Sequence, residues 1–518
     1  MARSFRESLN DKETFTFTYE LVPGRSTRLR QFERIINFAR AAAEDGRLHG
    51  LTITENAGGH PALSPAVLGR EILEIGLEPI LHFTCKDKNR NQIESSLFAR
   101  DRESLHNLLV MTGDFPRYGF MGKAKPVFDL DVVHLLKLIT EMEKGIELPP
   151  EAPGGGVKLP PMPFFKGCVV TPFKRFEAEL MPQYYKLHKK IRAGAQYVIT
   201  QVGFDARKFH ELLLYMKDEG LNVPLIGGVF VMDVRMARLF NKGIIPGIYV
   251  TNDYLAHIEI ESKKIGDHYK AALLRAAKLI AILRGIGYDG VHICGAKVNY
   301  DDIAFLLDKA EEFYPRWQEF LPEFHNAHPD TFYLYRKDPT TGLNTNERIE
   351  TAESARAPLM FHINLKVHDL FFEPGKGFYN QAVKFARKIS GTRYEKWFTK
   401  FEYTAKELLF DCQRCGDCFL GEMAYLCPQR GCAKNILNGP CGGSQNGYCE
   451  VYPDKICHYV KVYERLKAVG KRHLLREEFV PPRDWSLTGT SSWLNFWLGK
   501  DHHRHNKAGK NQEKDSPK

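Results

Sequence analysis

The sequence predicts an α/β protein, a (β/α)8 TIM barrel followed by a small cysteine-rich metal-binding domain. Two observations support this prediction. Over the first 300 residues, short β-branched or apolar runs alternate with amphipathic helical stretches, and eight of the eleven cysteines lie between Cys412 and Cys457. Because a chain of 518 residues is too long for one core, the two features are expected to belong to separate domains.

Eight runs have the length and composition of buried strands: 15–21, 50–54, 78–84, 108–113, 167–172, 197–203, 224–231 and 290–295. Helical periodicity marks the segments 28–44, 130–143, 184–193, 206–218, 269–284 and 302–312. Eight strand–helix units favour a closed barrel, and an open, doubly wound sheet is the second choice. A Pro/Gly-rich insertion at 149–161 precedes the fifth strand, and an extra helical stretch is expected within 245–285.

The remaining chain divides by composition. We expect a barrel domain over 1–312, a connecting helical and irregular region over 313–400, a cysteine-rich domain over 401–485 and a polar, basic, disordered tail over 486–518. Helices are expected at 380–389, 394–409 and 460–471. His502, His503 and His505 could bind a metal, but a solubilising tail is the preferred interpretation.

The cysteines have the spacing of a metal site, and their order is Cys412, Cys415, Cys418, Cys427, Cys432, Cys441, Cys449 and Cys457. Three thiolates in CxxCxxC can hold three corners of an iron–sulfur cube, while a remote cysteine followed by proline, here Cys427, holds the fourth. Two zinc sites of four cysteines each are the alternative. Disulfides need an oxidising compartment, and the first residues lack the apolar stretch of an export signal, so we expect a cytoplasmic protein.

Composition narrows the function classes. The chain is 43% hydrophobic and 26% charged, with no apolar stretch of membrane-spanning length, so no membrane association is expected. Its net charge of +10 comes from basic residues interleaved with acidic ones, which argues against nucleic acid and is compatible with an anionic substrate. No GxGxxG follows the first strand and no GxxxxGK[ST] occurs, which disfavours Rossmann and P-loop nucleotide sites.

Polar residues end several of the expected strands, where a barrel has its active site. They are Glu20, Thr54, Thr84, Asp114, Thr171 and Gln201, with His82 inside the third strand. Each alone is explained by a turn or a core hydrogen bond. Two carboxylates and an amide at three strand ends together predict a rim that binds a polar heterocycle and supplies a proton.

Four segments in the barrel region are more specific: 17–23 (FTYELVP), 81–85 (LHFTC), 112–116 (TGDFP) and 194–201 (GAQYVITQ). In this order they resemble signature blocks of the methylenetetrahydrofolate reductase family, over about residues 12–312. The stretch from Cys412 through 438–443 (NGPCGG) to Cys449 resembles the cysteine-rich domain that accompanies this reductase in some bacteria.

The resemblance implies a flavin, FAD or alternatively FMN, that reduces 5,10-methylenetetrahydrofolate to 5-methyltetrahydrofolate or runs in reverse, in one-carbon metabolism and methionine biosynthesis. It implies that Glu20 is the general acid for a folate nitrogen, that Asp114 lies near flavin and folate, and that Gln201 and Lys297 contact substrate. The flavin-contacting positions it implies are Thr54, His82, Thr112, Gly113, Asp114 and Lys190. Lys190 alone would be interpreted as a solvated lysine on a helix face. NAD(P)H or an electron-transfer protein would be the donor, and a homo-oligomer is compatible with the family.

The chain also departs from the family pattern. Thr112 stands where many members carry Arg, Leu21 and Val22 replace a phenylalanine pair, and Ala237 replaces a glutamine. These changes leave the exact substrate, flavin and donor open. They also keep a second hypothesis, a non-catalytic scaffold whose zinc module binds a protein partner. A nucleic-acid-binding zinc protein is a third, which would need a basic aromatic patch that the sequence lacks.

Overall fold

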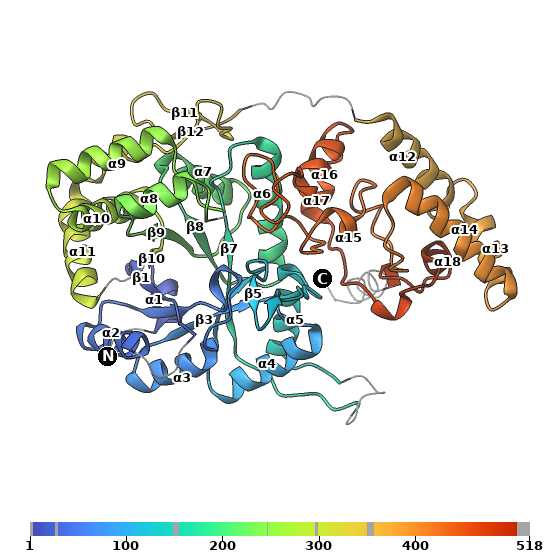
Figure 1. Cartoon of the computed structure of the whole chain (residues 1–518), viewed down its shortest axis with the longest axis horizontal. Helices are drawn as coiled ribbons and strands as arrows, with labels where there is room; N and C mark the ends of the chain where they lie inside the picture. Colours follow the sequence, from blue (N-terminus) through green and yellow to red (C-terminus); the bar gives the residue numbers. More distant parts are fainter. Residues whose placement is uncertain are drawn as a thin grey trace.

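Eight parallel strands close into a barrel in the N-terminal part of the chain (Figure 1). The computed structural model describes residues 4–25, 30–148, 155–245, 247–295, 299–349 and 357–504. Around the barrel the strand order is β1-β10-β9-β8-β7-β4-β3-β2. The strands are β1 (Thr16–Leu21), β2 (Gly50–Ile53), β3 (Pro79–Thr84), β4 (Asn107–Met111), β7 (Phe165–Val170), β8 (Tyr197–Val202), β9 (Leu225–Phe230) and β10 (Gly290–Cys294). The predicted closed barrel is confirmed, and the open sheet was the wrong alternative.

Helices surround the barrel in the expected alternation. They are α2 (Arg30–Asp45), α3 (Pro65–Ile75), α4 (Arg90–Arg102), α5 (Val132–Lys144), α6 (Glu177–Arg192), α7 (Ala206–Asp218), α8 (Val234–Asn241), α10 (His268–Ile286) and α11 (Tyr300–Phe313). Several begin at an acidic side chain that accepts a backbone N–H of the first turn, such as Asp131 before α5 and Asp233 before α8. The extra helical stretch expected before the eighth strand is α9 (Asn252–Ile265).

A short helix that the sequence did not suggest, α1 (Phe5–Asn10), packs at the barrel interior. The Phe5 ring is fully buried and meets Phe165 and Tyr197 edge-on, with ring centroids 5.8 and 5.2 Å apart. Tyr197 and Phe165 lie in the amino-terminal part of their strands, so α1 fills this end of the barrel. The opposite end is left for a site. Of the insertion expected at 149–161, residues 149–154 lie outside the described residues.

Two small hairpins, three 3-10 segments and the C-terminal helices make up the other described elements. Two small hairpins are β5 (Tyr118–Gly119) with β6 (Gly122–Lys123), and β11 (Tyr335–Lys337) with β12 (Asn344–Arg348). The 3-10 turns are η1 (Ala57–Gly59), η2 (Tyr314–Glu323) and η3 (Trp485–Leu487). The C-terminal helices are α12 (Leu359–Phe371), α13 (Tyr379–Ile389), α14 (Arg393–Phe410), α15 (Pro428–Gly431), α16 (His458–Lys467), α17 (Leu474–Glu477) and α18 (Ser492–Trp497).

The cysteine-rich region packs beside α6 of the barrel and shares its core (Figure 1). Ile436, Tyr459 and Val462 are buried in the same apolar cluster as Leu136 of α5 and Leu180 of α6. The barrel and the cysteine-rich region therefore share one core, in place of the separate cores expected from chain length, while α13 and α18 form a smaller cluster of their own. The cysteine-rich region is docked by apolar burial, which fixes its position relative to the barrel.

The predicted disordered tail from residue 486 is wrong for the part of the tail that the structure describes, which ends at residue 504. Leu494 and Trp497 of α18 pack against Ala386 and Ile389 of α13. The segment 492–498 carries these apolar residues, and their burial offsets the entropy of ordering it. His502 is also buried, at 1% exposure. No helix in the described ranges has the length and apolar character needed to span a membrane.

Candidate active site and metal centres

A cavity of about 300 Å³ opens at the carboxyl ends of the barrel strands. The lining includes every described residue that the sequence singled out for the barrel site: Glu20, Thr54, His82, Thr84, Thr112, Gly113, Asp114, Thr171, Lys190 and Gln201. Lys297 lies outside the described residues. The lining also includes residues that the sequence analysis did not assign to this site, namely Gln183, His292, Cys294, Lys434, Cys441 and Glu450. A cavity of this size at this edge of a barrel is the usual place for a small-molecule site.

Glu20 on β1 faces His292 on β10, with its Oε2 4.0 Å from Nε2 of the imidazole. A quarter of the Glu20 side chain remains exposed. Burial favours the neutral acid, but contact with His292 and the charge of His82 outweigh it, so the pKa of Glu20 lies below its usual value. His292 Nδ1 is 3.0 Å from the Thr18 hydroxyl, which orients the ring. Glu20 and His292 are thus placed to exchange a proton.

Four buried polar atoms in the lining have no hydrogen-bond partner among the described residues: Thr54 Oγ1, His82 Nε2, Thr171 Oγ1 and Gln183 Nε2. Buried polar groups are normally paired, because each unpaired one costs about 1–3 kcal/mol. Burial also lowers the pKa of His82 to about 4, so its ring is neutral near pH 7. These unpaired groups fit a ligand that carries several polar atoms.

Asp114 is held at the rim by the backbone. Its Oδ2 accepts a hydrogen bond of 2.7 Å from the Gly58 N–H. The neighbouring Gly59 has φ +76°, and a Cβ there would lie 2.2 Å from the Phe115 carbonyl oxygen. Only glycine fits that approach, so the turn at 57–59 and the loop of Asp114 are locked together.

Lys190 is buried, which corrects the interpretation of an isolated, solvated lysine. Its Nζ donates to the Val169 carbonyl at 2.5 Å, and no ion pair joins it to a carboxylate in the described part of the chain. Burial lowers its pKa to about 8. A buried ammonium beside a cavity and without a carboxylate partner favours an anionic group in that cavity.

The cysteine-rich region closes one side of the cavity. Lys434 Nζ donates to the Gly113 carbonyl at 2.8 Å and pairs with Glu450. Burial opposes the Lys434 charge, but the neighbouring Cys441 and Glu450 raise the pKa of Lys434 above its usual value. From the barrel side, Lys174 donates to the Gly442 carbonyl at 2.6 Å. One cysteine of this region, Cys441, thereby lies in the lining of the barrel cavity.

Asp131 joins the two parts of the chain. Its Oδ1 caps α5, accepting from the Val133 N–H at 2.8 Å. Its Oδ2 accepts from the backbone N–H groups of Leu437 and Asn438, at 3.0 and 2.8 Å. Although burial opposes ionisation, His134, Lys186 and these N–H groups hold the pKa of Asp131 well below its usual range. The site depends on this contact because residues 434–443 reach the cavity just beyond it.

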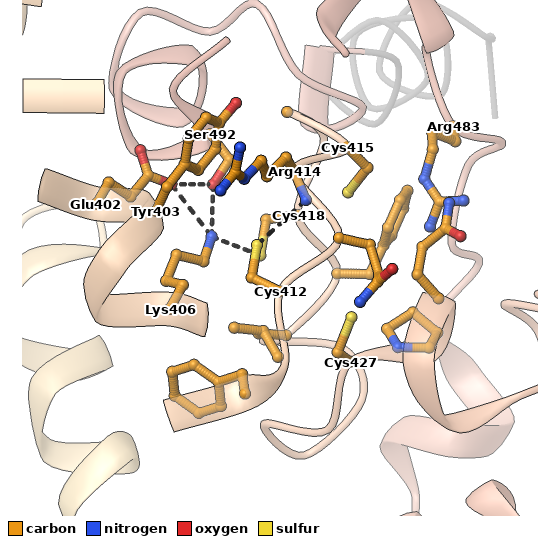
Figure 2. A pocket seen from close by; sticks show the side chains of 17 residues that line it. Glu402, Tyr403, Lys406, Cys412, Arg414, Cys415, Cys418, Cys427, Arg483 and Ser492 are labelled. Atoms are coloured by element: carbon orange, nitrogen blue, oxygen red, sulfur yellow. Dashed lines mark hydrogen bonds and ion pairs between the residues drawn. The ribbon is translucent and has the colours of Figure 1, made fainter. Parts of the chain in front are cut away.

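The eight cysteines fall into two groups of four. Cys412, Cys415, Cys418 and Cys427 line one small cavity, with Lys406 and Arg483 beside it (Figure 2). Lys406 Nζ lies 3.1 Å from Cys418 Sγ, and the Arg414 N–H donates to Cys412 Sγ at 3.4 Å. Such donors stabilise thiolates.

The second group consists of Cys432, Cys441, Cys449 and Cys457. Burial, followed by the charge of Cys441, raises the pKa of Cys432 to about 11 and that of Cys457 to about 12. Without a metal, these buried thiols would remain protonated. Metal binding deprotonates them, so both groups can hold a metal centre.

The spacing of the sulfurs bears on the choice of metal. A zinc ion with four Zn–S bonds of about 2.3 Å places its sulfurs about 3.8 Å apart. Among the described residues, which include all eight of these cysteines, no three cysteine sulfurs lie within 4.8 Å of one another. In neither group do three sulfurs stand as close together as tetrahedral zinc would hold them, and a cluster of several metal atoms suits the wider spacing.

Comparison with known proteins assigns the barrel. A model of the family described as methylenetetrahydrofolate reductase matches residues 4–294, more than half of the chain. The chain belongs to the methylenetetrahydrofolate reductase family. A second model, described as the methylenetetrahydrofolate reductase C terminal, matches residues 392–486, the cysteine-rich part of this reductase-family chain.

Individual relatives are distant. The 5,10-methylenetetrahydrofolate reductase of Salmonella typhimurium is 27% identical over 169 residues, which cover 32% of this chain and 48% of the relative. Methylenetetrahydrofolate reductase 2 of Saccharomyces cerevisiae is 26% identical over 200 residues, which cover 36% of this chain and 30% of the relative. The chain thus spans about half the length, or less, of the curated reductases it matches.

One solved structure is an uncharacterized protein from Clostridium thermocellum that binds two copies of 5-methyl-5,6,7,8-tetrahydrofolic acid. It matches with a TM-score of 0.41 and 15% identity, over 60% of this chain and 98% of its own.

His292 is a site residue that could have been found from the sequence. His292 lies between Val291 and Ile293 in the eighth strand, as His82 lies between apolar neighbours in the third. A histidine inside a buried strand run points into the barrel or its wall, and both of these reach the cavity. Lys434 and Glu450 carried no comparable signal, because their position depends on how the cysteine-rich region docks.

Proposed function

We propose that this protein is a flavin-dependent reductase that converts 5,10-methylenetetrahydrofolate to 5-methyltetrahydrofolate. The observation that supports it most is the convergence of Glu20, Asp114 and Gln201 on one cavity at the strand ends of a reductase-family barrel. An acid, a second carboxylate and an amide are the groups needed to bind a pterin and protonate its ring nitrogen.

The lining suits a flavin. The unpaired Thr54 hydroxyl and His82 Nε2 would meet polar edge atoms of the heterocycle, and the buried Lys190 would meet an anionic part of it. When bound, FAD or FMN supplies the hydride for the methylene carbon. Neutral His82 can serve as either donor or acceptor at the ring edge, since burial keeps its pKa near 4.

Glu20 would deliver the proton that opens the five-membered ring of the substrate. Its pKa lies below the usual value while the cavity is open to water. A folate that fills the cavity removes water from the carboxylate, which raises the pKa and favours the protonated acid. His292, whose Nε2 is 4.0 Å from the Glu20 carboxylate, can supply this proton, and the imidazole then takes up a new proton from solvent.

We further propose that the two cysteine groups hold iron–sulfur clusters, because their sulfurs stand too far apart for single zinc ions. Such clusters supply one-electron transfer when bound. Since Cys441 lies in the cavity lining, a cluster held by the second group would lie beside the proposed flavin. This position favours a protein electron donor over direct NAD(P)H oxidation.

The test begins with anaerobic purification, identification of the flavin, and assay of 5-methyltetrahydrofolate formation with reduced methyl viologen as donor. We expect bound flavin and turnover. In Lys190→Met, the loss of one buried charge should weaken flavin binding by at least about tenfold, since a hydrogen bond to a charged group contributes about 1.5–3 kcal/mol.

Lys189→Met is the matched control, because Lys189 is equally buried on the same helix but is not part of the lining. It should bind flavin as the wild type does. Protein that binds neither FAD nor FMN, or that binds flavin and leaves the folate unchanged, would contradict the proposal and favour the scaffold hypothesis.

A further inference from the structure

Beside the first cysteine group, two consecutive histidines meet one carboxylate. His502 Nε2 and His503 Nε2 lie 3.2 and 2.9 Å from the same oxygen, Oε1 of Glu422. Glu422 follows Cys418 in the loop before α15, whereas the histidines follow α18, so segments 80 residues apart converge here. All three ligand atoms lie within 4.8 Å of one another.

A carboxylate backs each histidine at its other ring nitrogen. His502 Nδ1 is 2.6 Å from Asp417 Oδ1, and His503 Nδ1 is 2.9 Å from Asp501 Oδ2. With Nδ1 donating to its carboxylate, each Nε2 is turned toward Glu422 and can offer a lone pair to an ion once its own proton is displaced. Metal-bound histidines almost always have this carboxylate–histidine arrangement, which fixes the tautomer and the ring orientation.

The rings are held in place by packing. His502 stacks on Phe419 with centroids 4.1 Å apart, and His503 meets Phe496 edge-on at 5.1 Å. Each imidazole is therefore oriented before any ligand arrives. Pre-set ligands reduce the entropy cost of binding an ion.

Two buried oxygens at this place lack a partner in the described part of the chain, Glu422 Oε2 and Asp501 Oδ1. Asp501 is 2% exposed. The three carboxylates Asp417, Glu422 and Asp501 carry three negative charges in a buried setting, and a divalent cation would neutralise two of them. Two ring protons would supply the same charge but would leave Glu422 Oε2, which can reach the ion, unpaired.

We propose that Glu422, His502 and His503 form a metal site for a zinc-class divalent cation, separate from the two cysteine groups. Zinc bonds to nitrogen and oxygen of about 2.0–2.1 Å place tetrahedral ligands about 3.4 Å apart, close to the spacing seen here. Two histidines and one glutamate leave the fourth position for water or Glu422 Oε2. Nitrogen and oxygen ligands distinguish this site from the thiolate groups.

The site would tie the C-terminal segment 501–503 to the loop that carries Asp417, between Cys415 and Cys418. The bound ion would therefore stabilise the loop that carries the first cysteine group. Binding displaces the Nε2 protons, so uptake of the cation releases protons.

The experiment uses the full chain, purified without oxygen, washed with EDTA and titrated with Zn²⁺ against a chromophoric chelator. The wild type should bind one more Zn²⁺ per chain than His503→Gln. Asp501→Asn, which removes only the backing carboxylate, should keep the site and weaken it by about 10–100-fold. His362→Gln, an exposed histidine of α12, is the control and should match the wild type.

Iron content and circular dichroism of each variant report whether the cysteine groups and the fold are intact. With Co²⁺ in place of Zn²⁺, the wild-type minus His503→Gln spectrum should lack thiolate-to-cobalt charge-transfer bands. Equal Zn²⁺ uptake by wild type and His503→Gln would overturn the proposal. If His503→Gln does not fold, a wild type that binds no Zn²⁺ outside its cysteine groups overturns it equally.

Discussion

Replacing Asp131 by Asn should loosen the docking of the cysteine-rich region on the barrel. The carboxylate has two acceptor oxygens, one for the cap of α5 and one for the N–H groups of Leu437 and Asn438. The asparagine amide has only one acceptor oxygen. If that oxygen keeps the helix cap, the NH₂ group faces the N–H groups of Leu437 and Asn438 and cannot accept from them. If the cap is kept, two backbone hydrogen bonds to a charged group are lost, at about 1.5–3 kcal/mol each. The expected cost is therefore about 3–6 kcal/mol.

The assay is hydrogen exchange of the amides at 437 and 438, together with the free energy of local opening that it reports. Asp233→Asn is the matched control, because Asp233 caps α8 without reaching the cysteine-rich region, and Asn caps a helix about as well as Asp. The control should change opening free energy by less than about 0.5 kcal/mol. Unchanged exchange at 437 and 438 in Asp131→Asn would refute the bridging role.

Two further predictions concern a glycine and a buried histidine. Gly416→Ala should deplete metal from the first cysteine group, because a Cβ there would lie 1.7 Å from the Leu487 carbonyl oxygen. Gly470→Ala has the same positive φ but open space around it and should keep the metal; equal metal in both variants would contradict the reasoning. Burial lowers the pKa of His82 from 6.5 to about 4. Between pH 6.5 and 4 the imidazole is therefore protonated in the unfolded chain but stays neutral in the folded one. The free energy of unfolding should fall by about 3 kcal/mol over this range. Urea titrations across this range should show a shallower decline for His82→Gln, and parallel slopes would count against a neutral buried ring.

The barrel strands could be predicted because buried parallel strands are continuous apolar runs with polar residues at their ends. The eight runs agree with the structure to within two residues at every end. The strand-end position also brought Glu20 and Asp114 together correctly, since all carboxyl ends of a barrel meet at one face.

Other features depend on tertiary contacts that a linear pattern does not contain. Lys190 has the helical spacing of a surface residue, yet α6 turns it into the barrel cavity. Cys441 belongs to a metal pattern, and its place in the same cavity follows from the docking through Asp131. The segment around Trp497 has a polar, basic continuation, which hid the apolar face that packs on α13. In each case the deciding interaction joins residues far apart in the sequence.

Glu20→Gln tests most directly the proposal that Glu20 protonates the folate. The amide keeps size and hydrogen bonding but cannot donate that proton. Stopped-flow reoxidation of the reduced flavin by 5,10-methylenetetrahydrofolate should slow by about 10²–10⁴-fold, while flavin content and its reduction by an artificial donor stay at the wild-type level. Reoxidation of the Gln variant at the wild-type rate would show that Glu20 does not supply this proton.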